Sequence, residues 1–581
     1  MTDPRAPTPA ARVIQWLRAN WLDVLCLAVV VAMAVKLVWS VDTAHDLMLD
    51  DEAIQLERGF RLFHPGDPNG PHGLPPPDYG PVYSFWYAFL HLFVRDPIRL
   101  YYVSYSCLVA MISAALYALS RALDAAPVAA LVATFLFLVS HVPLIMPYAA
   151  HFATLVVFVG CVLAARASTL RRALRWVLVA MILATYVRPE LALAFFVVAL
   201  VAAWLAWRAL RRNQVELRAI ALEMLGFALA VGALVLVLGE PLGGGRAFFA
   251  FGQHYARNVV ERDHLTANPW LSYPTFVKQD FGDVTSVAGA ARANPSAFAR
   301  HVLRNVTNLP ACFRNVIQPV LLLGLLFGKG ASRVTSDVAA LFAVAGSIAG
   351  AWALWARRKI EPQRAAVLLG FAGIMAASLA SALLVYPREH YVLSPLAVML
   401  VLAGVGATVV AQKLAARVRR DTAPRADRLP WPAIATVAIS AFLLAIVPSI
   451  AHGWCLQTVL SGVTIRPTPP SDALPTARAI ARFGIKERVV FLEPRWGYAL
   501  FSGLEYARLY PGQKDQPFGR FLEAKAIGII VLTDYYAQDP SFDGDPEFKA
   551  FLADPARSGF RLVDVPGSTT RVAVRESLLP N

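Results

Sequence analysis

The sequence consists largely of apolar segments, about eleven of them, joined by short loops. A helix needs about 20 predominantly apolar residues to cross a bilayer, and packing inside a bundle accommodates the shorter runs. Hydrophobic residues make up 57% of the chain and charged residues only 16%, which excludes an ordinary soluble enzyme. The sequence therefore predicts a polytopic α-helical membrane protein. The predicted spans are residues 19–41, 98–119, 126–142, 149–165, 176–187, 190–207, 219–239, 336–356, 365–386, 391–412 and 431–452.

The excess of positive charge lies in the short loops between the apolar segments. Six such stretches hold 22 Lys or Arg against 6 Asp or Glu, a net charge of +16 compared with +15 for the whole chain. Basic short loops mark the cytoplasmic side of a membrane, so this pattern indicates a membrane topology and excludes a nucleic-acid partner. The stretches are residues 1–18, 121–126, 166–175, 208–218, 357–364 and 413–428.

This topology divides the chain into three parts. Residues 1–18 form a cytoplasmic N-terminus ahead of a retained signal anchor, and residues 19–452 form the transmembrane domain. Within that domain, 42–97 and 240–335 are predicted to be large external loops. Residues 453–581 are predicted to be a small external α/β domain, because short β-type runs such as 489–492 and 527–532 alternate there with helical patterns. We expect this arrangement in the inner (plasma) membrane of a bacterium, with the C-terminal domain periplasmic or extracellular.

Two further apolar stretches are too short to span. Counting 316–328 as a span would place the basic segments 357–364 and 413–428 outside, so we interpret it as re-entrant or surface-lying. The stretch 81–94 is dense in aromatic residues, as expected of a helix at the level of the lipid headgroups.

Three adjacent carboxylates, Asp50, Asp51 and Glu52, follow a few residues after the first apolar run ends. Placing a carboxylate inside a bilayer costs free energy, whereas a carboxylate at the surface remains hydrated. The three acids therefore predict that this segment lies outside the bilayer. Apolar residues recur around them at helical spacing, which predicts a short surface helix. A Pro- and Gly-rich stretch then leads to Asp78, and the two acidic positions can converge as a general base and an orienting group. The alternative is a solvated acidic loop balanced by its own arginines.

The first external loop resembles that of GT-C class membrane glycosyltransferases. The shared features are Asp51-Glu52-Ala53 opening a surface helix after the first span, and a Pro-rich run ending in Tyr79-Gly80-Pro81-Val82-Tyr83. The resemblance is closest to the branch of protein O-mannosyltransferases and aminoarabinose transferases of lipid A. It implies that the Asp51–Glu52 pair carries the catalytic base, with Asp51 as that base and Asp50 as a rival. It also implies substrate contacts at Asp78 and Tyr79, although Tyr79 stands where some members carry a basic residue.

Two later segments also match this class, and both are predicted to lie on the external side. Residues 186–190 resemble an Arg-Pro-Glu turn, and residues 386–395 resemble an Arg-Tyr-x-x-x-x-Pro segment that holds Arg388 and Tyr391. Guanidinium matches phosphate oxygens in a forked geometry, so Arg388 is a candidate ligand for a lipid phosphate. The alternatives are a snorkelling interfacial role for Arg388 and a structural ion pair with Glu190 for Arg188.

The second external loop offers further candidate ligands. Arg246, Arg257 and Lys278 are candidates to hold an anionic donor. His254 and His264, with nearby acids, are compatible with a divalent metal, but their spacing matches no standard site and no metal ligand is assigned.

The resemblance implies a glycosyltransferase that uses a polyprenyl-phosphate sugar as donor, with no certain cofactor. Its acceptor would be a glycan, a lipid or a protein, and its remaining partners membrane lipids. The alternatives are a polysaccharide polymerase or ligase, which uses a diphosphate-linked oligosaccharide, and a transporter of lipid-linked glycans.

Overall fold

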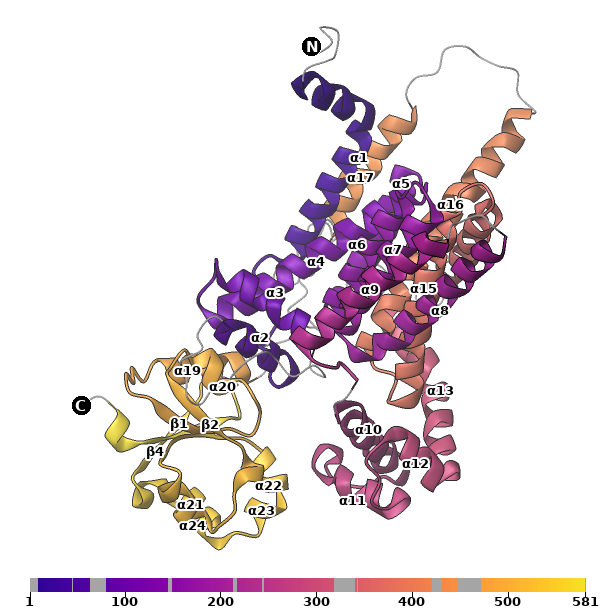
Figure 1. Ribbon diagram of the computed structural model, residues 1–581. Coiled ribbons are helices and arrows are strands. Elements are labelled where there is room, and N and C mark those ends of the chain that lie inside the picture. Colours follow the sequence, from indigo (N-terminus) through magenta and orange to yellow (C-terminus); the bar gives the residue numbers. More distant parts are fainter. Residues whose placement is uncertain are drawn as a thin grey trace.

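A computed structural model gives the fold of the chain (Figure 1). It describes residues 9–43, 45–62, 80–144, 149–212, 217–242, 245–317, 340–341, 343–420, 431–447, 449 and 472–579.

Apolar helices form the membrane part, and a helix occupies each of the predicted apolar segments. Six of the helices in the described residues are long and apolar enough to cross a membrane, and three shorter ones are also apolar. The structure thus confirms a multi-pass helical membrane protein, while the count of eleven spans stays a prediction. The helices are α1 (Pro9–Val38), α4 (Pro97–Ala122), α5 (Pro127–Val139), α6 (Ala149–Ala165), α7 (Leu170–Thr185), α8 (Ala192–Arg211), α9 (Leu217–Leu238), residues 343–357, α15 (Gln363–Leu384), α16 (Glu389–Arg420) and α17 (Trp431–Ile446).

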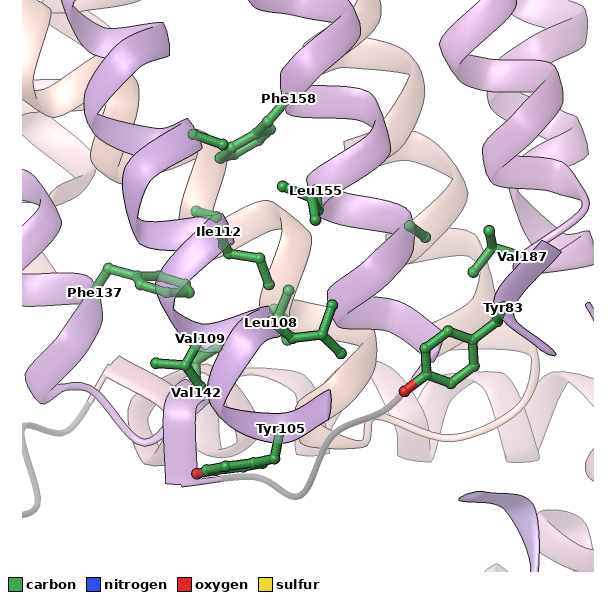
Figure 2. Close-up of a cluster of buried hydrophobic side chains, with 14 of the residues drawn as sticks. Tyr83, Tyr105, Leu108, Val109, Ile112, Phe137, Val142, Leu155, Phe158 and Val187 are labelled. Carbon is green, nitrogen blue, oxygen red and sulfur yellow. The ribbon is translucent and has the colours of Figure 1, made fainter. Parts of the chain in front are cut away.

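Close packing of apolar side chains holds this bundle together. Ile112 of α4, Phe137 of α5 and Phe158 of α6 are fully buried and point into the space between their helices (Figure 2). Helix 343–357 instead packs on α16 through glycines, where a Cβ at Gly350 would lie 2.0 Å from the Leu402 carbonyl oxygen. Small residues at such crossings bring backbones into van der Waals contact, which drives helix association in lipid.

Two groups of shorter helices gather at one end of the bundle (Figure 1). The first comprises α2 (Asp51–Arg61) and α3 (Pro81–His91), which correspond to the predicted acidic and aromatic surface helices. The two helices approach each other closely at Gly59, where a Cβ would lie 2.5 Å from the Ser84 carbonyl oxygen. The second group comprises α10 (Arg246–Asp263), α11 (Pro269–Phe281), α12 (Val287–Ala293) and α13 (Pro295–Ile317). Beyond Ile317, the predicted re-entrant segment 316–328 lies outside the described residues.

A small α/β domain follows at the same end of the molecule, and this part of the predicted fold class is confirmed (Figure 1). Its sheet has the order β2-β1-β3-β5-β4, with β2 and β3 parallel to β1 and β5 antiparallel to both β3 and β4. The edge strand β2 was not predicted, because its residues Tyr-Ala-Arg-Leu form no apolar run. The elements are α19 (Ala473–Ala481), β1 (Val489–Leu492), α20 (Tyr498–Ser502), β2 (Tyr506–Leu509), α21 (Phe518–Ala524), β3 (Ile527–Leu532), α22 (Tyr535–Gln538), α23 (Pro540–Asp543), α24 (Pro546–Ala553), β4 (Phe560–Asp564) and β5 (Arg571–Arg575).

Candidate active-site cavity

A cavity of about 330 Å³ opens where four distant segments meet. They are the start of α2, the turn between α7 and α8, the start of α10 and the segment that leads into α16. Five of the side chains predicted from the sequence line it, namely Asp51, Glu52, Arg246, Arg388 and Tyr391.

Asp51 is the first residue of α2, and its side chain is half exposed to the cavity. Its carboxylate oxygen Oδ1 lies 3.2 Å from Nη2 of Arg246, the first residue of α10. The start of a helix favours a carboxylate, because unpaired backbone N–H groups carry partial positive charge there. Asp51 is therefore a carboxylate held at a water-accessible cavity and paired with Arg246.

Asp50, the alternative candidate for the catalytic base, makes its contacts outside the cavity. Its backbone has a φ of +64° and it does not line the cavity. Its carboxylate accepts hydrogen bonds from Nε of Arg495 at 2.8 Å and from the backbone N–H of Trp496 at 2.9 Å. Both partners belong to the C-terminal domain, so Asp50 connects the first loop to that domain.

Glu52 is the buried member of the acidic triplet and only 1% exposed. The hydroxyls of Tyr83 and Tyr87, both on α3, donate hydrogen bonds to its oxygen Oε1. Burial raises the pKa of Glu52 to about 8 against the opposing effect of these bonds, and the charge of Asp51 adds to the rise. Glu52 is thus mostly protonated at neutral pH and is the lesser candidate for a proton acceptor.

Replacing Glu52 with glutamine is expected to stabilise the protein at high pH. The pKa of Glu52 is raised in the folded state, so its contribution to stability is complete below pH about 4.5 and is lost as the pH rises through about 8. Glutamine mimics the protonated acid and does not titrate. The unfolding temperature of the detergent-solubilised variant, relative to that of the parent, should increase as the pH rises. Parallel pH profiles for the two proteins would contradict the raised pKa.

Arg388 also lines the cavity and differs from the other arginines there. Arg246 pairs with Asp51 and Arg188 pairs with Glu190, as the structural alternative for Arg188 predicted. Within the described residues, Arg388 has no carboxylate in ion-pair distance, and its guanidinium lies 5.9 Å from the ring centre of Trp270. With Glu52 protonated, the described residues that line the cavity include three guanidiniums and two carboxylates, which leaves about one positive charge in excess.

His254 also lines the cavity, and its ring contacts the aromatic rings of Trp270 and Tyr386. Burial, with Arg388 and Arg257 nearby, lowers the pKa of His254 to about 3, so the imidazole is neutral. Its Nδ1 is buried and has no hydrogen-bond partner among the residues that the structure describes. The sequence indicated His254 only as a weak metal candidate. His264, by contrast, is exposed at the far end of α10.

The other predicted ligands lie away from the cavity or outside the described residues. Arg257 pairs with Glu261 at 2.7 Å and lines a neighbouring cavity of about 440 Å³, whose wall also contains Arg388. Lys278 is exposed and pairs with Asp283. Asp78 and Tyr79 fall outside the described residues.

No metal centre is evident in the part of the chain that the structure describes. Nowhere in it do three or more His, Cys, Asp or Glu side chains form a group that could hold a metal ion. A divalent metal therefore stays a prediction.

Comparison with known proteins gives structural likeness alone. No protein-family model matches the chain, and neither does any curated protein. The archaeal oligosaccharyltransferase AglB from Archaeoglobus fulgidus, solved with an inhibitory peptide and a dolichol-phosphate, has a TM-score of 0.45 and 12% identity, over 97% of this chain and 75% of that one. The Archaeoglobus fulgidus oligosaccharyltransferase solved with Zn and sulfate has a TM-score of 0.37 and 12% identity, over 96% and 74% of the two chains. Likeness at this level says nothing about the reaction, so the function is argued from the cavity.

Proposed function

We propose that this chain is a GT-C type glycosyltransferase that moves a sugar from a polyprenyl-phosphate donor to an acceptor hydroxyl on the external face of the membrane. One observation carries the proposal: the Asp51 carboxylate and the uncompensated Arg388 guanidinium line the same cavity. A phosphodiester carries one negative charge, which matches the positive charge left over in the cavity. The basic loops between the spans support a cytoplasmic N-terminus and an external cavity. The proposed location is a bacterial inner membrane.

In the proposed reaction, the donor phosphate lies at Arg388 and competes with Asp51 for Arg246. Asp51, released from that ion pair, accepts the proton of the acceptor hydroxyl as its oxygen attacks the anomeric carbon of the sugar. The bond between the anomeric carbon and the phosphate oxygen breaks, and polyprenyl phosphate leaves with the electron pair. Arg388 stabilises the charge that develops on the phosphate, because a guanidinium forms paired, charge-assisted hydrogen bonds with it.

The proposal is tested with two kinds of donor. The purified chain is reconstituted in vesicles that contain membrane lipid, polysaccharide or protein acceptors, together with radiolabelled undecaprenyl-phosphate-mannose or undecaprenyl-phosphate-arabinose. We expect label to move to an acceptor and undecaprenyl phosphate to appear in stoichiometric amount. A parallel assay uses a diphosphate-linked oligosaccharide. Turnover of that donor alone would favour the polymerase or ligase alternative, and movement of intact donor across the bilayer would favour the transporter.

A further inference from the structure

Three acidic residues of the first loop are bound by the C-terminal domain and do not face the cavity. Asp46 accepts hydrogen bonds from the first two backbone N–H groups of α19, at 2.9 and 2.6 Å. Asp50 binds Arg495 and Trp496. Glu57, in the middle of α2, is fully buried against β2 and the turn after β1. These contacts surround the segment that carries Asp51 and Glu52.

Glu57 is the centre of a buried network that we call the docking network, formed with Trp496, Tyr506 and Arg508. Nη2 of Arg508 donates to the Glu57 carboxylate at 2.7 Å, and the Trp496 indole N–H and the Tyr506 hydroxyl also donate to it. The Arg508 side chain is 9% exposed and lies 3.6 Å from the centre of the Trp496 ring. A buried carboxylate with this many donors is fixed in direction as well as in position.

The backbone of α2 is fixed to the same turn of the C-terminal domain. The Asp50 N–H donates to the Trp496 carbonyl oxygen at 2.7 Å, and the Trp496 N–H donates back to the Asp50 carboxylate. Gly497, which has a φ of +136°, lies so near that a Cβ there would be 2.8 Å from Leu49 and 3.0 Å from Ala53. Glu493, also buried, accepts from the Gly497 and Ala499 N–H groups and so holds the turn in place.

Helix geometry converts these contacts into a constraint on the candidate base. At 3.6 residues per turn, Glu57 projects about 120° away from Asp51 and about 140° away from Glu52 around the axis of α2. Glu57 faces the C-terminal domain, Glu52 faces α3 and Asp51 faces the cavity. Fixing Glu57 therefore fixes the rotation of α2 about its axis, and that rotation sets the direction of Asp51.

We propose that Glu57 and Arg508 are positioning residues, through which the C-terminal domain holds Asp51 toward the cavity. Neither residue lines the cavity, so each acts through α2. The effect of these residues on catalysis rests on the proposed function. Their effect on the orientation of residue 51 is independent of that function and is tested separately.

The test of orientation needs no substrate. In a full-length background with Cys26, Cys107, Cys161, Cys312 and Cys455 replaced by alanine, Asp51→Cys and Arg246→Cys are introduced together and treated with a short bifunctional methanethiosulfonate. Nη2 of Arg246 lies 3.2 Å from Oδ1 of Asp51 in the parent, so cysteines at the two positions should be bridged by a reagent about as long as the arginine side chain that they lack. Adding Glu57→Gln or Arg508→Gln should slow cross-linking by up to about tenfold, since the loss of a charge-assisted hydrogen bond shifts the equilibrium between the oriented and the rotated α2 by about that factor and the rate follows the oriented fraction.

Lys549→Gln is the matched control, because Lys549 forms an exposed ion pair with Asp543 on the same domain and has no ion pair with the described part of the first loop. Its cross-linking rate should equal that of the parent. If a Glu57 variant does not fold, Tyr506→Phe removes one hydrogen bond from Glu57 and should give a smaller effect in the same direction. Equal cross-linking rates in Tyr506→Phe, Glu57→Gln, Arg508→Gln and the control would overturn the proposal.

The transfer assay then separates positioning from folding. Glu57→Gln, with Asp51 present, should lower kcat for undecaprenyl-phosphate sugar about tenfold and leave KM unchanged, because the Arg388 wall is untouched. A loss that only follows the amount of folded protein would contradict the positioning role. If the parent transfers no sugar, the proposed function fails, while the cross-linking rates still decide whether Glu57 and Arg508 orient residue 51.

Discussion

Asp51→Asn is expected to lower sugar transfer by about 10²–10⁴-fold, the usual contribution of a positioned general base. Asparagine keeps the shape of the side chain and its place at the start of α2, but it cannot accept the proton of the acceptor hydroxyl. The Arg246 partner at 3.2 Å is exposed to the cavity, so loss of this ion pair should cost little stability. The initial rate of transfer from undecaprenyl-phosphate sugar, measured on folded protein of equal amount, reports the effect.

Asp50→Asn is the matched control for this prediction. Its carboxylate binds Arg495 and Trp496 of the C-terminal domain, so the variant should unfold at a lower temperature and lose at most about tenfold in transfer rate, the loss expected of a positioning contact. The two adjacent acids should therefore separate, one affecting rate and the other stability. A near-parental rate for Asp51→Asn would exclude Asp51 as the base, and that result together with a loss of about 10²-fold or more for Asp50→Asn would assign the base to Asp50.

The separation of these neighbours shows where sequence reasoning reached its limit. Hydropathy and the position of the acids after the first span were sufficient to predict a multi-pass helical protein with a surface helix at Asp51. The directions of the acids depend on partners far along the chain. Asp50 is turned by residues about 445 positions later, and Glu52 is buried by Tyr83 and Tyr87 on the next helix. No local periodicity contains that information.

The arginines and the histidine in and near the cavity also show which features depend on distant parts of the chain. The sequence indicated Arg388 as a phosphate ligand and Arg188 as half of an ion pair, and the Arg188–Glu190 pair is present. The neutral state of His254 was not predictable, because it follows from burial between rings of α11 and the segment before α16. Arg257 was grouped with Arg246 by sequence proximity, but it lines the neighbouring cavity, since the two lie eleven residues apart on one helix.

Arg388→Gln should reduce transfer about 10²–10³-fold, comparable to the loss of an oxyanion-stabilising donor elsewhere. The negative charge on the phosphate increases as the sugar leaves, so the interaction is stronger in the transition state and kcat should fall more than KM rises. Arg388→Lys keeps the charge but loses the forked geometry, and it should recover only part of the rate. Equal kcat values for the parent and both variants would exclude Arg388 from charge stabilisation.

The unfolding temperature should distinguish Arg388 from Arg188, and Arg188→Gln is therefore the control for this prediction. Arg388 has no carboxylate partner among the described residues, so removing it strands no acid and relieves the excess positive charge beside His254. The unfolding temperature of Arg388→Gln should therefore equal or exceed that of the parent. Arg188→Gln strands Glu190, and the resulting unpaired carboxylate should lower the unfolding temperature. A stable but inactive Arg388 variant beside a destabilised Arg188 variant is the result expected if the cavity keeps one guanidinium unpaired in order to bind a phosphate.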